Sequence, residues 1–213
     1  MSWIAPLALL ALLLVARPLL KVVVALVGGP AIGRRVLARQ PDQVHLREAG
    51  IGAWRDGAAA ERLTQPLLEL GYETVGVFTA PEVPGVVLRL LVMPRECVLA
   101  TVYEHPRTGL WVELATRYTG GTACAITSGQ DRGLAPRPRH PVTHLPGADP
   151  RLLHARLLTL RPKGGMARVE ASQAVRVFEE GFAEAMAWRK SQGISRGEVV
   201  RVAVRGVRRQ RAA

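Results

Sequence analysis

The sequence has few aromatic residues and almost no lysine. Aromatic residues make up 5% of the 213 residues, whereas hydrophobic residues together make up 48%. The core must therefore be aliphatic, built from Leu, Val and Ala, and the composition is that of a globular protein rather than a disordered one. The basic residues are arginine except at Lys21, Lys163 and Lys190. Heavy use of Arg and Ala indicates a GC-rich bacterial source.

Cysteine and the common catalytic motifs are also scarce. Cys97 and Cys124 are the only two cysteines and form no CxxC pattern, which argues against a disulfide framework. The motifs GxGxxG, GxxxxGK[ST], HExxH and GxSxG are all missing. His140 and His144 have the spacing of metal ligands on a helix, but Pro141 between them breaks a helical face. We therefore predict no catalytic residue, no metal site and no cofactor.

The N-terminal segment is a long apolar run. A helix over Trp3–Val27 would be about 37 Å long, enough to cross a bilayer core of about 30 Å. Arg17 and Lys21 follow its most apolar part, and no basic residue precedes it. The positive-inside rule then places the N-terminus outside and the rest of the chain in the cytoplasm, as a single-pass protein of the cell membrane. A cleaved signal peptide and a buried soluble helix are the alternatives.

Five short runs rich in Val, Leu, Thr and Tyr predict strands, over Tyr72–Thr79, Val86–Met93, Cys97–Glu104, Leu110–Tyr118 and Thr122–Ser128. Their short links favour antiparallel neighbours, and Thr119-Gly120-Gly121 is a strong hairpin signal. The alternating pattern indicates a sheet with only one face fully covered. The predicted fold class is α+β, an N-terminal transmembrane helix followed by a single domain with a five-stranded antiparallel meander sheet packed by helices.

Helices are predicted on both sides of these strands. The first covers Ala58–Leu70, a second begins at Asp149-Pro150 and ends near Leu160, and a third begins at Ser172. A last helix would follow a capping box at Ser195, with a strand as the alternative for residues 195–211. The domain organisation that follows is a membrane anchor at 1–30, a juxtamembrane connector at 31–57, the α+β domain at 58–192 and a basic helix or tail at 193–213.

The net charge of +12 points to anionic partners. Two clusters of basic residues are candidate binding sites for anionic lipid or another anionic ligand. The first is the arginine face of the last helix, made of Arg201, Arg205, Arg208 and Arg209. The second lies in the polar loop 129–150 and contains Arg137, Arg139 and His140. A simpler interpretation of the first cluster is that its arginines are only solvated while the valines opposite pack on the domain.

Three classes of function follow from these features. We expect a membrane-anchored accessory domain without enzymatic activity, which contacts the membrane through residues 3–27 and binds an unknown protein partner or anionic lipid head groups. The alternative is an enzyme of an unrecognised type, acting on an anionic substrate held under the 129–150 loop by its arginines. Nucleic-acid binding is disfavoured because the basic residues are spread along the chain without interleaved aromatic residues.

Overall fold

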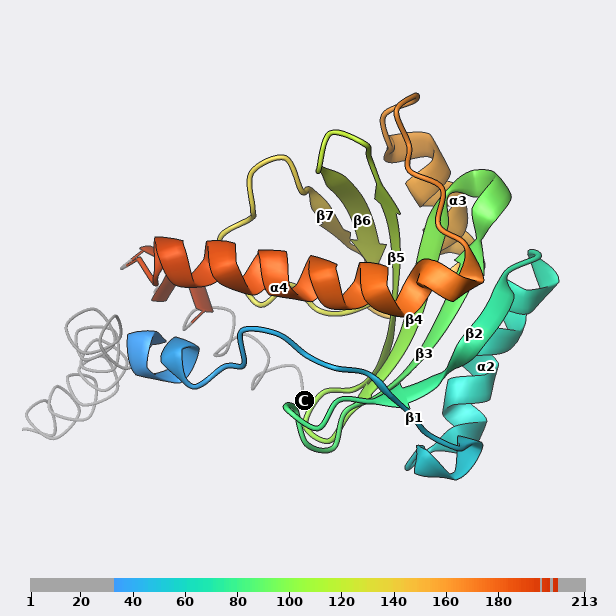
Figure 1. The fold of residues 1–213 in the computed structure, drawn as a ribbon, viewed down its shortest axis with the longest axis horizontal. Helices are drawn as coiled ribbons and strands as arrows, with labels where there is room; N and C mark the ends of the chain where they lie inside the picture. Colours follow the sequence, from blue (N-terminus) through green and yellow to red (C-terminus); the bar gives the residue numbers. More distant parts are fainter. Residues whose placement is uncertain (1–32, 196, 200, 203–213) are drawn as a thin grey trace, which may run out of the picture. The chain divides into compact units, whose positions relative to one another are not determined.

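The computed structural model describes residues 33–195, 197–199 and 201–202 (Figure 1). A seven-stranded sheet lies at its centre, with the strands in sequence order. The strands are β1 (Arg47–Glu48), β2 (Glu73–Thr79), β3 (Val87–Met93), β4 (Val98–His105), β5 (Gly109–Arg117), β6 (Ala123–Thr127) and β7 (Val142–His144). The labelled helices are α2 (Gly57–Glu69), α3 (Pro150–Leu160) and α4 (Ala174–Gln192), with 3-10 turns η1 (Ile51–Ala53), η2 (Pro94–Glu96) and η3 (Ala171–Gln173).

The sheet corrects the predicted five-stranded antiparallel meander. The five predicted strands correspond to β2–β6, with ends shifted by one residue or less, and these strands pair antiparallel. The structure adds β1 and β7 at the two edges, and β7 runs parallel to β6. The sheet is therefore mixed and has seven strands. The two edge strands are two and three residues long, too short to show an alternating pattern.

The predicted transmembrane helix is the second part of the fold class to be corrected. Of the helices that the structure describes, none is long and apolar enough to cross a membrane. The segment on which the prediction was made, residues 3–27, lies outside the described residues. The observed fold is α+β with a mixed sheet.

Helices cover both faces of the sheet, so the prediction of a sheet with one partly wet face is wrong. On one face, α2 and α3 enclose a core that includes Leu67, Leu91 and Leu153. On the other face, α4 crosses the strands (Figure 1), and Val175 and Phe178 pack against Leu88 and its neighbours. All seven residues of β3 are buried as a result. A strand buried on both faces is nearly continuous in apolar residues rather than alternating.

The helix starts follow capping rules. The Asp56 side chain accepts a hydrogen bond of 2.9 Å from the Ala59 N–H at the start of α2. At the start of α3, the Asp149 side chain accepts from the Arg151 N–H at 2.8 Å and Pro150 occupies the first turn, as predicted. The prediction that Ser172 caps the next helix is wrong, because a capping box at Glu170 starts η3, which leads into α4.

The chain divides into two compact units. The larger unit consists of Pro41–Asp131 and Pro136–Arg189 and contains the whole sheet. The remainder, which we call the basic unit, consists of Met1–Gln40, Arg132–Ala135 and Lys190–Ala213.

Hydrogen bonds join the described segments of the basic unit. Glu198 accepts a hydrogen bond of 3.1 Å from the Ala135 N–H, and the Lys190 Nζ donates to the Gln40 carbonyl at 2.7 Å. Residues 197–199 and 201–202 are helical, which favours the predicted helix over a strand there. The Glu198 N–H donates to Ser195 Oγ at 3.2 Å, as a helix cap at Ser195 requires.

Candidate functional site

The two units differ completely in charge. The larger unit contains sixteen Lys and Arg residues and sixteen Asp and Glu residues, so its formal charge is zero. The basic unit contains the other thirteen basic residues and a single acidic one, Glu198, which gives the whole net charge of +12. Glu198 is itself buried, with 2% of its surface exposed. The positive charge of the protein therefore belongs to the segments outside the sheet domain.

The described part of the basic unit exposes both arginine and aliphatic side chains. On the helical segment at 33–38, Leu37 is buried whereas Arg34 and Arg35 are exposed. Seven large hydrophobic side chains are exposed in the described residues, and three of them lie in this small unit: Val36, Leu134 and Val202. A surface that mixes arginine with exposed aliphatic side chains has the composition of a membrane-interface surface.

Of the predicted arginine face, the structure describes one residue. Arg201 is exposed, and its Nε donates to the Gly133 carbonyl at 3.4 Å. This contact joins the C-terminal segment to residues 132–135 of the same unit. Arg205, Arg208 and Arg209 lie outside the described residues.

The candidate residues in the 129–150 loop have different surroundings. The Arg137 guanidinium forms an ion pair of 3.5 Å with Glu184 on α4, and Glu184 also pairs with Arg117 at 3.1 Å. His140 Nδ1 lies 3.0 Å from the Pro138 carbonyl. Arg139 is exposed, and its side chain has no hydrogen-bond or ion-pair partner among the residues that the structure describes. Of the two candidate arginines in this loop, Arg137 is therefore paired and Arg139 is not, so they do not form a clamp.

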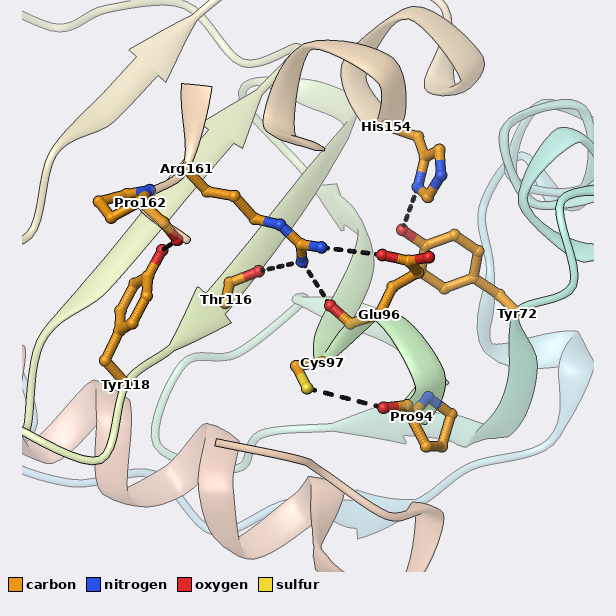
Figure 2. A network of polar contacts seen from close by, with 9 residues as sticks. All are labelled: Tyr72, Pro94, Glu96, Cys97, Thr116, Tyr118, His154, Arg161 and Pro162. Atoms are coloured by element: carbon orange, nitrogen blue, oxygen red, sulfur yellow. Dashed lines mark hydrogen bonds and ion pairs between the residues drawn. The ribbon is translucent and has the colours of Figure 1, made fainter. Parts of the chain in front are cut away.

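A polar network that the sequence did not predict lies between α3 and the sheet (Figure 2). The Arg161 guanidinium, 8% exposed, pairs with the Glu96 carboxylate at 2.8 Å and donates to Thr116 Oγ1 at 3.1 Å. It also donates to the Glu96 backbone carbonyl. Nearby, the Tyr72 hydroxyl and His154 Nδ1 share a hydrogen bond of 2.9 Å. These contacts fasten the middle and the C-terminal end of α3, because His154 lies within the helix and Arg161 follows it.

Three titratable groups in and beside the network have shifted pKa values and are uncharged at neutral pH. Burial raises the pKa of the Tyr72 phenol, so it stays protonated at neutral pH. Burial also lowers the pKa of His154, although the Glu96 carboxylate acts in the opposite direction, so this imidazole is neutral at neutral pH. Cys124 is the cross-strand partner of Thr116, and burial raises the pKa of its thiol, which stays protonated at neutral pH. No thiolate results, and Tyr72, His154 and Arg161 are all engaged by partners within the fold, so we assign the network a structural role.

A hollow of about 250 Å³ opens beside this network. It lies between the β5–β6 hairpin and the loop after α3, and we call it the glycine hollow after its lining: Tyr118, Thr119, Gly120, Thr122, Pro162, Gly164 and Gly165. A second hollow of about 390 Å³ is lined mainly by Pro, Ala, Val and Gly, with Arg55 as its only charged lining residue. In the described part of the chain no group of three or more His, Cys, Asp or Glu side chains is placed to hold a metal ion.

Comparison of the chain with protein-family models, with curated proteins and with solved structures found no match.

Proposed function

We propose that this protein is a non-catalytic accessory protein that binds anionic lipid surfaces through its basic unit, while the electroneutral sheet domain provides a stable platform. The separation of charge carries the proposal: thirteen basic residues and one acidic residue lie in the basic unit, against equal numbers in the larger unit. Each Lys or Arg near an anionic bilayer contributes about 1 kcal/mol. A minority of the thirteen is enough for stable adsorption.

Lipid fits the basic unit better than nucleic acid does. The described segments of this unit, 33–40, 132–135, 190–195, 197–199 and 201–202, contain no aromatic residue on which a base could stack. They expose Val36, Leu134 and Val202 instead. Aliphatic side chains gain from contact with acyl chains but have little to gain from a phosphate backbone.

An enzyme acting on an anionic substrate has less support. The groups that look most like an active site, His154, Tyr72 and Arg161, are engaged with one another or with Glu96. Arg137, which we expected in a substrate clamp, pairs with Glu184. The predicted placement at a cell membrane, with the domain in the cytoplasm, stays a prediction.

The test compares two variants of the full chain that carry the same net charge. In the first, Arg201, Arg205, Arg208 and Arg209 are all replaced by Gln. In the second, four exposed arginines of the larger unit are replaced by Gln: Arg47, Arg62, Arg107 and Arg156. Each variant lowers the formal charge from +12 to +8. Co-sedimentation with vesicles of phosphatidylcholine, with and without phosphatidylglycerol, measures the part of the binding that depends on anionic lipid.

The first variant should lose most of the phosphatidylglycerol-dependent binding, by up to about a thousandfold if each arginine contributes about 1 kcal/mol. The second should bind nearly as the unaltered chain does. Equal losses in both variants would show that only the total charge matters and would refute a dedicated basic unit. Unimpaired vesicle binding by the first variant, with loss of binding to random-sequence DNA, would point to nucleic acid instead.

A further inference from the structure

Backbone N–H groups that have no acceptor among the described residues line the glycine hollow. Four of its lining carbonyl groups already accept hydrogen bonds, those of Tyr118, Thr122, Pro162 and Gly165. Four of its lining N–H groups donate to no acceptor within the residues described, those of Gly120, Thr122, Gly164 and Gly165. Backbone N–H groups gathered in a glycine-rich turn are the usual protein site for an anion.

The two walls of the hollow are held together before any ligand arrives. The Tyr118 hydroxyl donates to the Pro162 carbonyl at 2.9 Å, a bond drawn in Figure 2. The Thr119 N–H donates to the Gly165 carbonyl at 2.8 Å, and the Thr119 hydroxyl reaches the same carbonyl at 3.3 Å. A pre-formed site spares a ligand the entropic cost of ordering the loops.

Two cations without partners among the described residues lie near this hollow, although neither lines it. A Cβ atom on Gly120 would lie 3.9 Å from Nη2 of Arg139, so the guanidinium lies against the hairpin that forms one wall. Arg139 has a φ of 61°, in the left-handed region that non-glycine residues seldom adopt and that is enriched at functional sites. Lys163 lies between Pro162 and Gly164 on the other wall, is exposed, and has no partner in the part of the chain that is described.

We propose that the glycine hollow is a binding site for a phosphoryl group, with the lining N–H groups and Arg139 as its donors and Lys163 as a second positive charge. Phosphate oxygens accept several hydrogen bonds at once, and a guanidinium binds them with a geometry that a lysine cannot match. The volume of about 250 Å³ leaves room for a substituent on the phosphate. The site belongs to the electroneutral unit, so it does not depend on the proposed lipid binding by the basic unit.

Titration of the full chain with inorganic phosphate, followed by isothermal calorimetry and amide chemical shifts, tests the site. Phosphate should bind saturably, with the largest shifts at Gly120, Gly164 and Gly165. Arg139→Gln should weaken binding about tenfold, as loss of a charge-assisted hydrogen bond does, and Lys163→Gln less. The matched control is Arg156→Gln, an exposed arginine on α3 whose loss should change the affinity less than about twofold. Shifts without saturation, or equal effects of Arg139→Gln and Arg156→Gln, would overturn the proposal.

The source of the phosphoryl group is resolved by two further probes, glycerol 3-phosphate in solution and vesicles of phosphatidylcholine with phosphatidic acid. If Arg139→Gln weakens binding of both, the natural ligand is a lipid head group. If it weakens only glycerol 3-phosphate, the ligand is a free phosphorylated molecule. The variant that lacks Arg201, Arg205, Arg208 and Arg209 should bind inorganic phosphate normally, so failure of the lipid proposal and failure of this one are distinguishable.

Discussion

Replacing Glu113 by Gln should stabilise the protein at neutral and alkaline pH but have little effect in acid. Glu113 lies on β5, opposite Thr101 of β4 and Thr127 of β6, and its side chain is on the sheet face that α4 covers. In the described structure its carboxyl group has no hydrogen-bond or ion-pair partner. Burial raises the pKa of Glu113 from 4.5 to about 7. The folded protein therefore binds a proton here that the unfolded chain releases.

The sign and size of the effect follow from linkage. Below about pH 4.5 the carboxyl group is protonated in both the folded and the unfolded protein, and the full free energy of unfolding is present. Because the folded-state pKa is raised, this free energy falls as the pH rises from there through about 7. A difference of about 2.5 pKa units corresponds to at most about 3 kcal/mol above pH 7. Gln keeps the shape and removes the charge. Between about pH 4.5 and pH 8, the unaltered protein should lose up to about 3 kcal/mol relative to Glu113→Gln.

Urea unfolding followed by circular dichroism, at about pH 4.5 and at about pH 8, measures this difference in the free energy of unfolding. The control is Glu73→Gln, at an exposed glutamate of β2 that has no ion pair or hydrogen bond from its side chain in the described residues. Its effect should be the same at both pH values. If Glu113→Gln changes the free energy of unfolding equally in acid and at about pH 8, the carboxyl group does not titrate as we infer and the reasoning fails.

Two further substitutions test the parts that position α2 and α3. Asp56→Ala should lower the free energy of unfolding by about 1 kcal/mol in urea titrations, because the N-cap bond to the Ala59 N–H is lost; an unchanged value would argue against this cap. Arg161→Met should lower the free energy of unfolding by about 2 kcal/mol, because Glu96 loses its partner but keeps some access to water. Scanning calorimetry would detect this loss as a lower melting temperature. A melting temperature equal to that of the unaltered protein would show that the Arg161 network does not fasten α3.

The central strands could be predicted from the sequence because their signals are local. Runs of Val, Leu and Thr mark β2–β6, and Thr119-Gly120-Gly121 marks the β5–β6 hairpin. The Asp149-Pro150 cap of α3 is equally local. In contrast, β7 consists of three residues that pair in parallel with β6 after a long loop, and nothing in Val142–His144 specifies that pairing.

The covered second face of the sheet was missed for a related reason. The charged residues Glu113 and Arg117 suggested solvent, but Arg117 reaches α4, where it donates to the Val177 carbonyl at 2.9 Å. The contact between Arg161 and Glu96 joins residues 65 positions apart. The charged residues of each unit can be counted in the sequence, but the boundaries that separate the two units come only from the structure. Such long-range contacts leave no periodic trace in a single sequence.

The most direct test of the central claim is hydrogen–deuterium exchange of the full chain with and without vesicles that contain phosphatidylglycerol. The claim is that the basic unit, and not the sheet domain, contacts the anionic surface. Added vesicles should slow exchange in residues 33–40, 132–135 and 190–202 and leave β2–β6 unchanged. Protection confined to the sheet domain, or protection that is the same with pure phosphatidylcholine, would contradict it.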